Sequence, residues 1–373
     1  MGGTTLTNRR NFLTGAGAAA GMLFYGCGAP QRADAQGTPK APPPKGPIII
    51  GGKKVKTIDV HSHCLFQEAL DLMGDEAKAL VPPINGNGPH EIFMTVEDRT
   101  KAMDAGGVDM EIISVNPFWY GKDRDLAAKI VSLQNDKLAE LVASKPDRFA
   151  AFASLTLQDP KLAVIQLQIA MKKQGLKGAA IGDQVAGSEF SDPKFDPVWA
   201  KAEELGAVLF IHPQGVPELN KRWAGNGWLA NTIANPLATT IALNHLIFQG
   251  TLDKFPGLKV LGAHGGGYLG SYAPRDDHAC LVAPTYCDPN IKLKKKPTEY
   301  LNQMYFDALV FTPEALRHLV AQVGASQVMM GSDYPYPWDL HPTENILATT
   351  TLSDAQKRGI LGENAERVFG LKA

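Results

Sequence analysis

Four side chains that can bind a metal ion lie at the ends of apolar runs. His61 and His63 follow the run 58–60 and are two residues apart, so on an extended chain both imidazoles point to the same side. His212 follows the run 209–211, and Asp333 follows the run 327–331. Three neutral imidazoles and one carboxylate suit Zn²⁺, or iron, cobalt or manganese, and leave a position open for water or substrate. A structural histidine would explain His212 taken alone, but not four such residues together.

His264 ends another apolar run and is followed by three glycines. Glycines let a substrate approach the backbone closely and leave the imidazole accessible. We therefore expect His264 to act as an acid/base in catalysis, and we expect Asp333 to take part beside it. A fifth metal ligand and a structural histidine are the alternatives for His264.

These residues need a scaffold that brings distant strand ends together. Beyond residue 53, apolar runs alternate with helical patterns. The expected strands are 55–60, 110–115, 149–154, 178–181, 207–211, 259–262, 303–307 and 327–331, and the clearest helices are 125–144, 160–174, 197–205, 236–249 and 313–323. Eight strand–helix units predict an α/β fold, a (β/α)8 TIM barrel, whose strand ends converge on one face. A doubly wound open sheet is the alternative.

The first 52 residues have a different composition. Asn8-Arg9-Arg10-Asn11-Phe12-Leu13 precedes a weakly apolar run, 15–24, that is shorter than the roughly 20 residues needed to cross a bilayer. We interpret 1–35 as a twin-arginine signal peptide for export to the periplasm, cleaved after Ala35 or lipidated at Cys27. Residues 36–52 are rich in Pro, Lys and Gly and form the expected linker, with the folded domain at 53–373.

The overall composition narrows the function. In 373 residues, 37 Lys+Arg balance 38 Asp+Glu, and the formal net charge is −1, so no basic surface is expected for nucleic acid or membrane. No transmembrane span is expected. Four cysteines are too few for a disulfide scaffold, although Cys280 and Cys287 could form one disulfide. The composition fits an enzyme acting on a small molecule.

Several motifs together resemble the amidohydrolase superfamily, in the branch of aminocarboxymuconate-semialdehyde decarboxylase and related aromatic-acid decarboxylases. The motifs are His61-Ser62-His63, His212-Pro213, His264-Gly265-Gly266-Gly267 and Gly331-Ser332-Asp333-Tyr334-Pro335. The resemblance implies one metal ion held by the four ligands named above, with His264 handling the proton of metal-bound water or substrate. The strand 178–181 carries no lysine that could be carboxylated, which favours one metal rather than two.

The resemblance also suggests substrate contacts. Arg275 lies where this branch has an arginine that reaches the substrate carboxylate of a neighbouring subunit, which implies a homodimer, although a surface ion pair is an equal alternative. Tyr336 lies where the branch places an aromatic ring over the substrate. Trp119 and Trp228 are candidate pocket walls, with core packing as the alternative. The loop 82–88 lacks a second arginine found in the decarboxylase, and Arg99 is the nearest candidate.

Two chemical hypotheses use the same site. The first is decarboxylation of a small aromatic or unsaturated carboxylic acid, in which His264 moves the proton that replaces the carboxylate. The second is hydrolysis of an ester, lactone or amide, with His264 or Asp333 as general base. Export makes the cytoplasmic muconate semialdehyde an unexpected substrate. A binding or metal-storage protein is a third hypothesis, but it would be expected to lack a ligand or His264, and all are present.

Overall fold

The computed structural model describes residues 46–79, 92–93, 95–339 and 341–371. The predicted signal peptide, most of the predicted linker and the loop 82–88 lie outside this part of the chain. The folded part starts slightly earlier than the predicted residue 53. A hairpin pairs β1 (Ile49–Ile50) with β2 (Lys53–Lys54), and the Ile50 side chain is buried.

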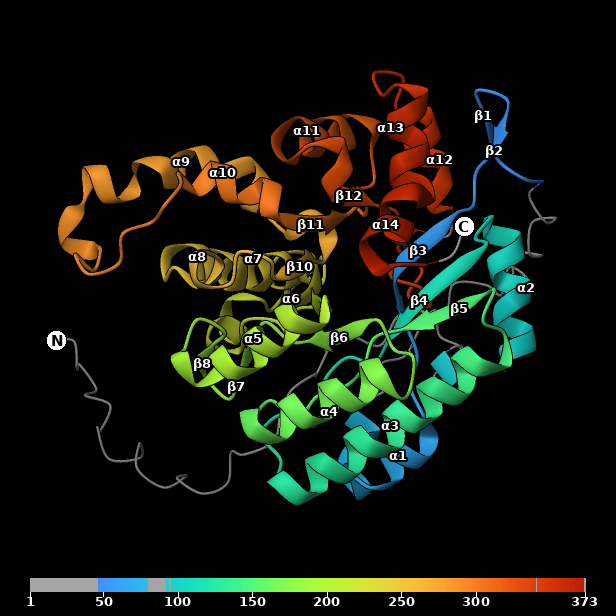
Figure 1. The fold of residues 1–373 in the computed structure, drawn as a ribbon, viewed down its shortest axis with the longest axis horizontal. Coiled ribbons are helices and arrows are strands. Elements are labelled where there is room, and N and C mark those ends of the chain that lie inside the picture. Colours follow the sequence, from blue (N-terminus) through green and yellow to red (C-terminus); the bar gives the residue numbers. More distant parts are fainter. Residues whose placement is uncertain (1–45, 80–91, 94, 340, 372–373) are drawn as a thin grey trace, which may run out of the picture.

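Eight parallel strands form a closed barrel (Figure 1). They are β3 (Ile58–His63), β4 (Met110–Ser114), β5 (Phe149–Ala151), β6 (Gly178–Ile181), β9 (Val208–Ile211), β10 (Lys259–Gly262), β11 (Met304–Asp307) and β12 (Val328–Met329). Hydrogen bonding runs β3-β4-β5 and β6-β9-β10-β11-β12, and two single bridges, Ala153 to Ala179 and Ser62 to Tyr334, join the two groups. The predicted (β/α)8 barrel is confirmed, and the open sheet is not.

Helices cover the outside of the barrel. They are α1 (Gln67–Asp71), α2 (Val96–Gly106), α3 (Arg124–Ser144), α4 (Pro160–Lys172), α5 (Asp196–Leu205), α6 (Leu229–Thr232), α7 (Ala234–Phe248), α8 (Thr251–Lys254), α9 (Leu269–Val282), α10 (Pro297–Tyr300), α11 (Pro313–Val323), α12 (Pro342–Ala348), α13 (Asp354–Arg358) and α14 (Asn364–Phe369). Local signals set the starts: Asp159 accepts a hydrogen bond from Leu162 N before Pro160, and Thr312 accepts one from Ala315 N before Pro313. Within the described residues, no helix combines the length and apolarity needed to cross a membrane.

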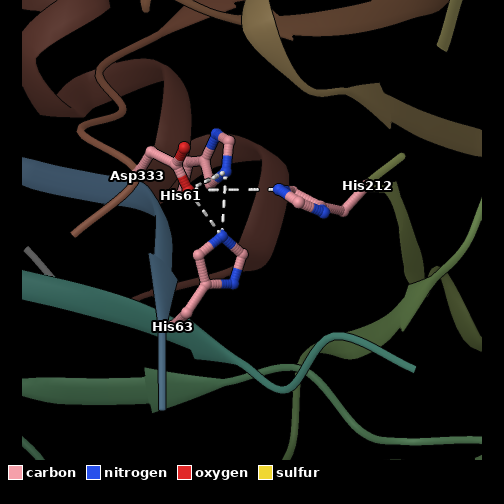
Figure 2. Close-up of side chains that lie close together, drawn as sticks. All are labelled: His61, His63, His212 and Asp333. Atoms are coloured by element: carbon pink, nitrogen blue, oxygen red, sulfur yellow. Dashed lines mark hydrogen bonds and ion pairs between the residues drawn. The ribbon is translucent and has the colours of Figure 1, made fainter. Parts of the chain in front are cut away.

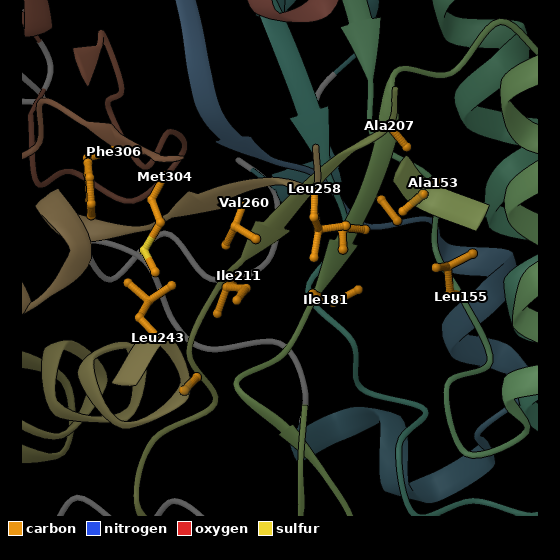
Figure 3. Close-up of a cluster of buried hydrophobic side chains, with 14 of the residues drawn as sticks. Ala153, Leu155, Ile181, Ala207, Ile211, Leu243, Leu258, Val260, Met304 and Phe306 are labelled. Carbon is orange, nitrogen blue, oxygen red and sulfur yellow. The ribbon is translucent and has the colours of Figure 1, made fainter. Parts of the chain in front are cut away.

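Alternation along the strands separates two apolar layers. Ile58, Val60, Ile112 and Phe210 belong to one buried cluster, which fills the inside of the barrel. Their neighbours along the strands belong to a larger cluster that packs against the helices, and Figure 3 shows part of it around Ile181, Ile211, Val260, Met304 and Phe306. Because both faces of each strand are buried, the strands read as continuous apolar runs, which is why the sequence located them well.

One segment projects from the barrel. The end of α9 and the loop that leads to α10, orange in Figure 1, extend away from the body, and we call residues 276–296 the arm. A disulfide joins Cys280 and Cys287 at its tip, as the sequence allowed. Leu281 and Val282 are each 79% exposed and Tyr286 is 92% exposed, so the arm carries large apolar side chains in solvent.

Candidate metal centre

A bulge in β3 directs its two histidines into the barrel. The pairing register with β4 shifts between Asp59 and Ser62, so β3 has one more residue than its partner there. Before the bulge, Ile58 and Val60 belong to the inner cluster. After it, His61 and His63 take the inward positions at the carboxyl end of the strand. The bulge therefore converts an apolar inner face into a pair of ligands.

The structure brings together the four predicted metal ligands, His61, His63, His212 and Asp333 (Figure 2). All four are buried, and one ligand atom from each lies within 4.8 Å of the others. Asp333 Oδ1 lies 2.9 Å from His63 Nε2, 3.2 Å from His61 Nε2 and 4.0 Å from His212 Nε2. The four ligands come from β3, from the end of β9 and from the loop after β12, which are distant in sequence.

The hydrogen bonds around the histidines fit a metal ion. Ser114 Oγ donates to the carbonyl of Ser62, so it accepts from His63 Nδ1 at 2.8 Å and leaves His63 Nε2 with a free lone pair. His61 Nδ1 donates to Asp307 Oδ2 at 2.7 Å. Neither buried ring nitrogen of His212 has a hydrogen-bond partner in the described part of the chain. An unpartnered His212 Nε2 that lies 4.0 Å from Asp333 Oδ1 suits a divalent cation between them.

The pKa shifts of the site residues also favour a bound metal ion. Burial lowers the pKa of His63 to about 4 and that of His212 well below its usual range, so both rings are neutral at pH 7. Burial also acts to lower the pKa of His61, but Asp333 and Asp307 outweigh it and raise the pKa to about 10. Despite its burial, Asp333 has a pKa well below its usual range because of the adjacent His61. The centre thus favours one positive charge, which a metal ion would supply in place of the His61 proton.

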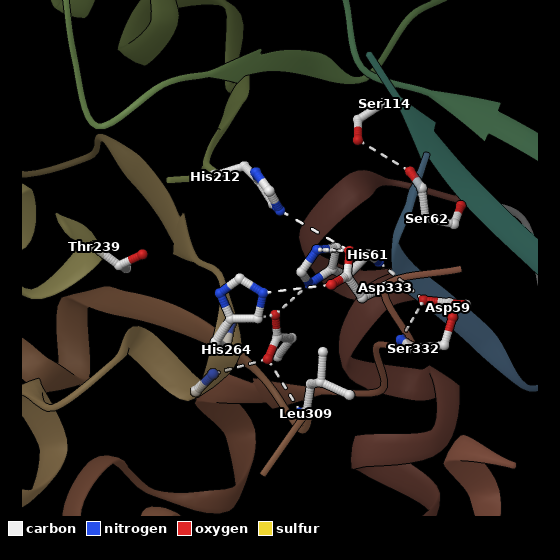
Figure 4. A network of polar contacts seen from close by, with 12 residues as sticks. Asp59, His61, Ser62, Ser114, His212, Thr239, His264, Leu309, Ser332 and Asp333 are labelled. Atoms are coloured by element: carbon white, nitrogen blue, oxygen red, sulfur yellow. Dashed lines mark hydrogen bonds and ion pairs between the residues drawn. The ribbon is translucent and has the colours of Figure 1, made fainter. Parts of the chain in front are cut away.

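Asp307 is a functional residue that the sequence reasoning did not assign. It lies at the end of β11, fully buried, and its Oδ2 accepts from both His61 Nδ1 and His264 N (2.8 Å), while its Oδ1 accepts from Gly265 N at 2.8 Å. One carboxylate therefore orients a ligand and the loop of the expected acid/base. The signal was a carboxylate at the end of an apolar run, 304–306, the same signal that marked Asp333. Figure 4 shows how His61 and His264 lie beside Asp333.

Asp59 stabilises the metal centre through hydrogen bonds with His61 and Ser332. Its Oδ1 accepts from His61 N at 2.9 Å, and its Oδ2 accepts from the Ser332 hydroxyl. Burial, with a further contribution from Glu111, raises the pKa of Asp59 to about 7. Gly331 is required for close approach, because a Cβ there would lie 2.9 Å from the Cβ atoms of both His61 and Asp307. These contacts fix the position of Asp333, which follows β12.

Arg99 has a structural position rather than a substrate contact. It is buried, its Nε donates to Glu111 Oε2 at 2.5 Å, and its Nη1 donates to the carbonyl of His63 at 2.8 Å. The guanidinium also lies over the Tyr334 ring, 5.2 Å from its centroid. The suggestion that Arg99 binds a substrate carboxylate is therefore corrected: it holds the backbone of a ligand strand.

His264 lies beside the ligands and lines a cavity. Its Nε2 is 3.6 Å from Asp333 Oδ2, and its ring centroid is 5.1 Å from that of His61 and 5.4 Å from that of His212. His264 has a φ of +55°, in the left-handed region, which the hydrogen bonds from its own N–H and from Gly265 N to Asp307 stabilise. His264 and Asp333 both line a cavity of about 130 Å³. The expected acid/base is therefore accessible to a small molecule.

The other predicted contact residues lie in different places. The Tyr336 ring is half-buried, with its centroid 5.9 Å from that of His63, and burial raises the pKa of its phenol. Trp228 is 52% exposed and stacks on Trp338, which lines the cavity. Trp119 does not reach the site: it is fully buried and its Nε1 donates to the carbonyl of Leu155, so its role is packing. Arg275 is exposed on α9 and does not line the cavity beside His264.

A closed (β/α)8 barrel with three histidines and one aspartate at its carboxyl-terminal end defines a metal-dependent hydrolase or lyase. The chain belongs to the amidohydrolase family, which matches residues 58–371. This is the superfamily that the sequence motifs resemble.

Two relatives and one solved structure show which kind of enzyme the chain is similar to. The chain is 32% identical to 2-amino-3-carboxymuconate-6-semialdehyde decarboxylase of Dictyostelium discoideum over 73% of its length and 76% of that protein. It is 30% identical to gamma-resorcylate decarboxylase of Rhizobium radiobacter over 76% of its length and 89% of that protein. A solved dihydroxybenzoic acid decarboxylase from Polaromonas, with bound manganese and the inhibitor 2-nitroresorcinol, is 25% identical with a TM-score of 0.71, over 86% of this chain and 98% of that one. These relatives favour decarboxylation over hydrolysis.

Proposed function

We propose that this protein is a metal-dependent decarboxylase of a small aromatic carboxylic acid. The observation that carries the proposal is the cavity beside the four-ligand centre, because it is lined by both His264 and Asp333. The names of the relatives add the substrate class: gamma-resorcylate and dihydroxybenzoic acid are benzoic acids with ring hydroxyl groups. We infer that this chain acts on an acid of that kind.

The residues of the site support such a reaction. A bound divalent ion would draw electron density from a substrate oxygen, a role that His61, His63, His212 and Asp333 can support as ligands. When the bond to the carboxylate breaks, its electron pair stays on the ring carbon, carbon dioxide leaves and a proton must be delivered to that carbon. His264 lines the cavity, and its Nε2 lies 3.6 Å from Asp333 Oδ2. With Asp333 beside it, His264 can donate that proton to the ring carbon and then take up another.

Carbon dioxide release tests the reaction. The purified protein, with its metal content measured, is incubated with 2,6-dihydroxybenzoate, other hydroxybenzoates and a panel of aryl esters and lactones. We expect carbon dioxide and the corresponding phenol in equal amounts from at least one acid. Cleavage of an ester or lactone without gas would overturn the proposal in favour of the hydrolase alternative, which uses the same site.

We propose Zn²⁺ as the native metal, with manganese as the first competitor. Three imidazoles and one carboxylate are a common donor set for zinc, whereas the Polaromonas relative was solved with manganese. Metal analysis of protein purified without added metal, followed by removal and addition of each ion singly, tests this. The native metal is the one found at about one per chain that also restores activity, and a manganese result would contradict the zinc proposal.

We also propose a homodimer in which Arg275 contacts the substrate of the partner subunit. The support is the resemblance stated above and the exposed apolar arm, since Leu281, Val282 and Tyr286 would be covered by a second copy. Light scattering of wild type and the Leu281→Asp/Val282→Asp variant tests the assembly, with a dimer and a monomer expected respectively. Arg275→Ala should weaken acids far more than neutral ligands, and equal weakening would indicate a surface ion pair instead.

We propose that the protein is exported to the periplasm by the twin-arginine route. The support is the sequence around Arg9 and Arg10. Fractionation of cells that produce the full chain should give a periplasmic product, and Arg9→Lys/Arg10→Lys should leave it in the cytoplasm. Mass spectrometry of the product distinguishes cleavage after Ala35 from a lipid at Cys27, and an unprocessed cytoplasmic wild type would contradict the proposal.

A further inference from the structure

Aromatic side chains from three separate loops meet at the cavity beside His264. Trp338 follows β12, Phe311 follows β11, and Trp228 precedes α6 in the long connection after β9. The Trp228 and Trp338 rings stack with centroids 5.6 Å apart and an interplanar angle of 13°, and the Phe311 ring lies 6.3 Å from Trp338 at 58°. Phe311 and Trp338 themselves line the cavity.

These rings are unusually placed for side chains that pack only against each other. Phe311 is 54% exposed and Trp228 is 52% exposed. Both residues also have positive φ angles, +63° and +50°, which non-glycine residues rarely adopt. Exposed aromatic surface and backbone strain at the rim of one cavity are typical of a ligand contact.

The cavity is also lined by neutral polar side chains. Asn231 on α6 and Asn235 on α7 line the cavity, four residues apart, and both are half-buried. Each amide offers donors and an acceptor for hydrogen bonds. None of the described residues that line the cavity is Lys or Arg. These amides suit a neutral polar substituent of the substrate.

We infer that Phe311 and Trp338 recognise the ring of an aromatic acid, while Asn231 and Asn235 hydrogen-bond a neutral substituent such as a hydroxyl group. The inference rests on the proposed function for the identity of the acid. It assigns selectivity to the cavity: hydroxylated aromatic acids are preferred over acyclic acids. The reacting end of the ring then points towards His264 and Asp333.

Direct binding tests the assignment without turnover. The probes are 2-nitroresorcinol and nitrobenzene, which share a ring and a nitro group but differ in the two hydroxyl groups. Both are titrated by calorimetry into wild type and into the Phe311→Leu, Trp338→Leu, Asn231→Ala and Asn235→Ala variants, after metal content has been matched. Leucine retains an apolar side chain but removes the ring. Trp223→Ala is the control, because Trp223 lies in the same connection after β9 as Trp228 but does not line the cavity.

We expect the two leucine variants to weaken both probes about five- to tenfold, as expected for the loss of a ring contact. The two alanine variants should weaken 2-nitroresorcinol severalfold and leave nitrobenzene unchanged, and Trp223→Ala should bind like wild type. Wild-type binding by both leucine variants, or equal weakening of the two probes by the asparagine variants, would overturn the inference. Because no turnover is measured, normal binding with no carbon dioxide release would count against the proposed function alone.

Discussion

The carboxyl-terminal end of the barrel and the arm at 276–296 differ in what holds their side chains. At the barrel end, His61 is fixed by Asp307, His63 by Ser114, and the backbone of His63 by Arg99. On the arm, Leu281, Val282 and Tyr286 are mostly exposed and a disulfide closes the tip. The side chains of the metal centre are therefore held by contacts within the chain, whereas the large apolar side chains of the arm lie in solvent. Chemistry and assembly are expected to respond to different substitutions.

The largest effect is expected from His264→Ala, which changes the barrel end without removing a proposed ligand. Loss of a general acid/base lowers turnover about 100- to 10,000-fold, while the bound metal should remain at the wild-type level. Metal analysis and carbon dioxide release on the same sample measure both quantities. His61→Ala is the matched comparison and should lose the metal as well. If His264→Ala also lost the metal, His264 would be a fifth ligand.

The two regions also differ in whether their carboxyl groups are buried, and the pKa of Asp183 provides a test of this difference. Burial raises the pKa of Asp183 from its ordinary value of 3.8 to about 6, although a hydrogen bond from Gln214 N (2.6 Å) opposes the shift. Between these pH values the folded protein holds a proton that the unfolded chain releases. The resulting stabilisation is complete below pH 3.8 and is lost as the pH rises through 6, by about 3 kcal/mol in total.

Asp183→Asn does not titrate, so the stability of wild type relative to this variant should fall by most of that amount between pH 4 and pH 7. Denaturant unfolding at each pH measures it. A constant difference for Asp183→Asn would mean that water reaches this carboxylate.

Much of the barrel end could be predicted from the sequence, because parallel strand ends converge and each ligand follows an apolar run. Asp307 has the same signal, but residue type alone does not distinguish a carboxylate that binds a metal from one that orients a histidine. Arg99 could not be assigned, since its partner Glu111 is identified only by the packing of α2 against β4. Nor does sequence separate Trp119, which is buried in the core, from Trp338, which lines the cavity.

The arm was less predictable for a related physical reason. Its helix α9 could not be placed from an apolar pattern, because the residues at its end face solvent. The spacing of Cys280 and Cys287 allowed a disulfide without requiring one, and the structure contains it. Burial produces a recognisable pattern in the sequence, whereas side chains that face solvent do not.

Asp307→Asn, at the barrel end, should weaken metal binding, whereas a matched substitution near the arm should not. The amide retains one acceptor but places an NH₂ group against donors that now bond both carboxylate oxygens, so His61 loses its fixed orientation. Loss of such a support weakens metal binding about 10- to 100-fold. Competition with a metal-binding dye measures it. Asp277→Asn is the control, because Asp277 accepts from Thr298 N and Oγ1 on the arm side, and its metal affinity should be unchanged.

The smallest effect on the barrel is expected from Cys280→Ser/Cys287→Ser. The disulfide spans seven positions at the tip of the arm, so its loss frees a short loop rather than the core. Metal content and the unfolding temperature should change little, by about 2 °C or less, because the cooperative unit is the barrel. Hydrogen exchange should rise only within 276–296. Faster exchange in β10 or β11, or a loss of metal, would show that the arm supports the centre and that the two regions are not independent.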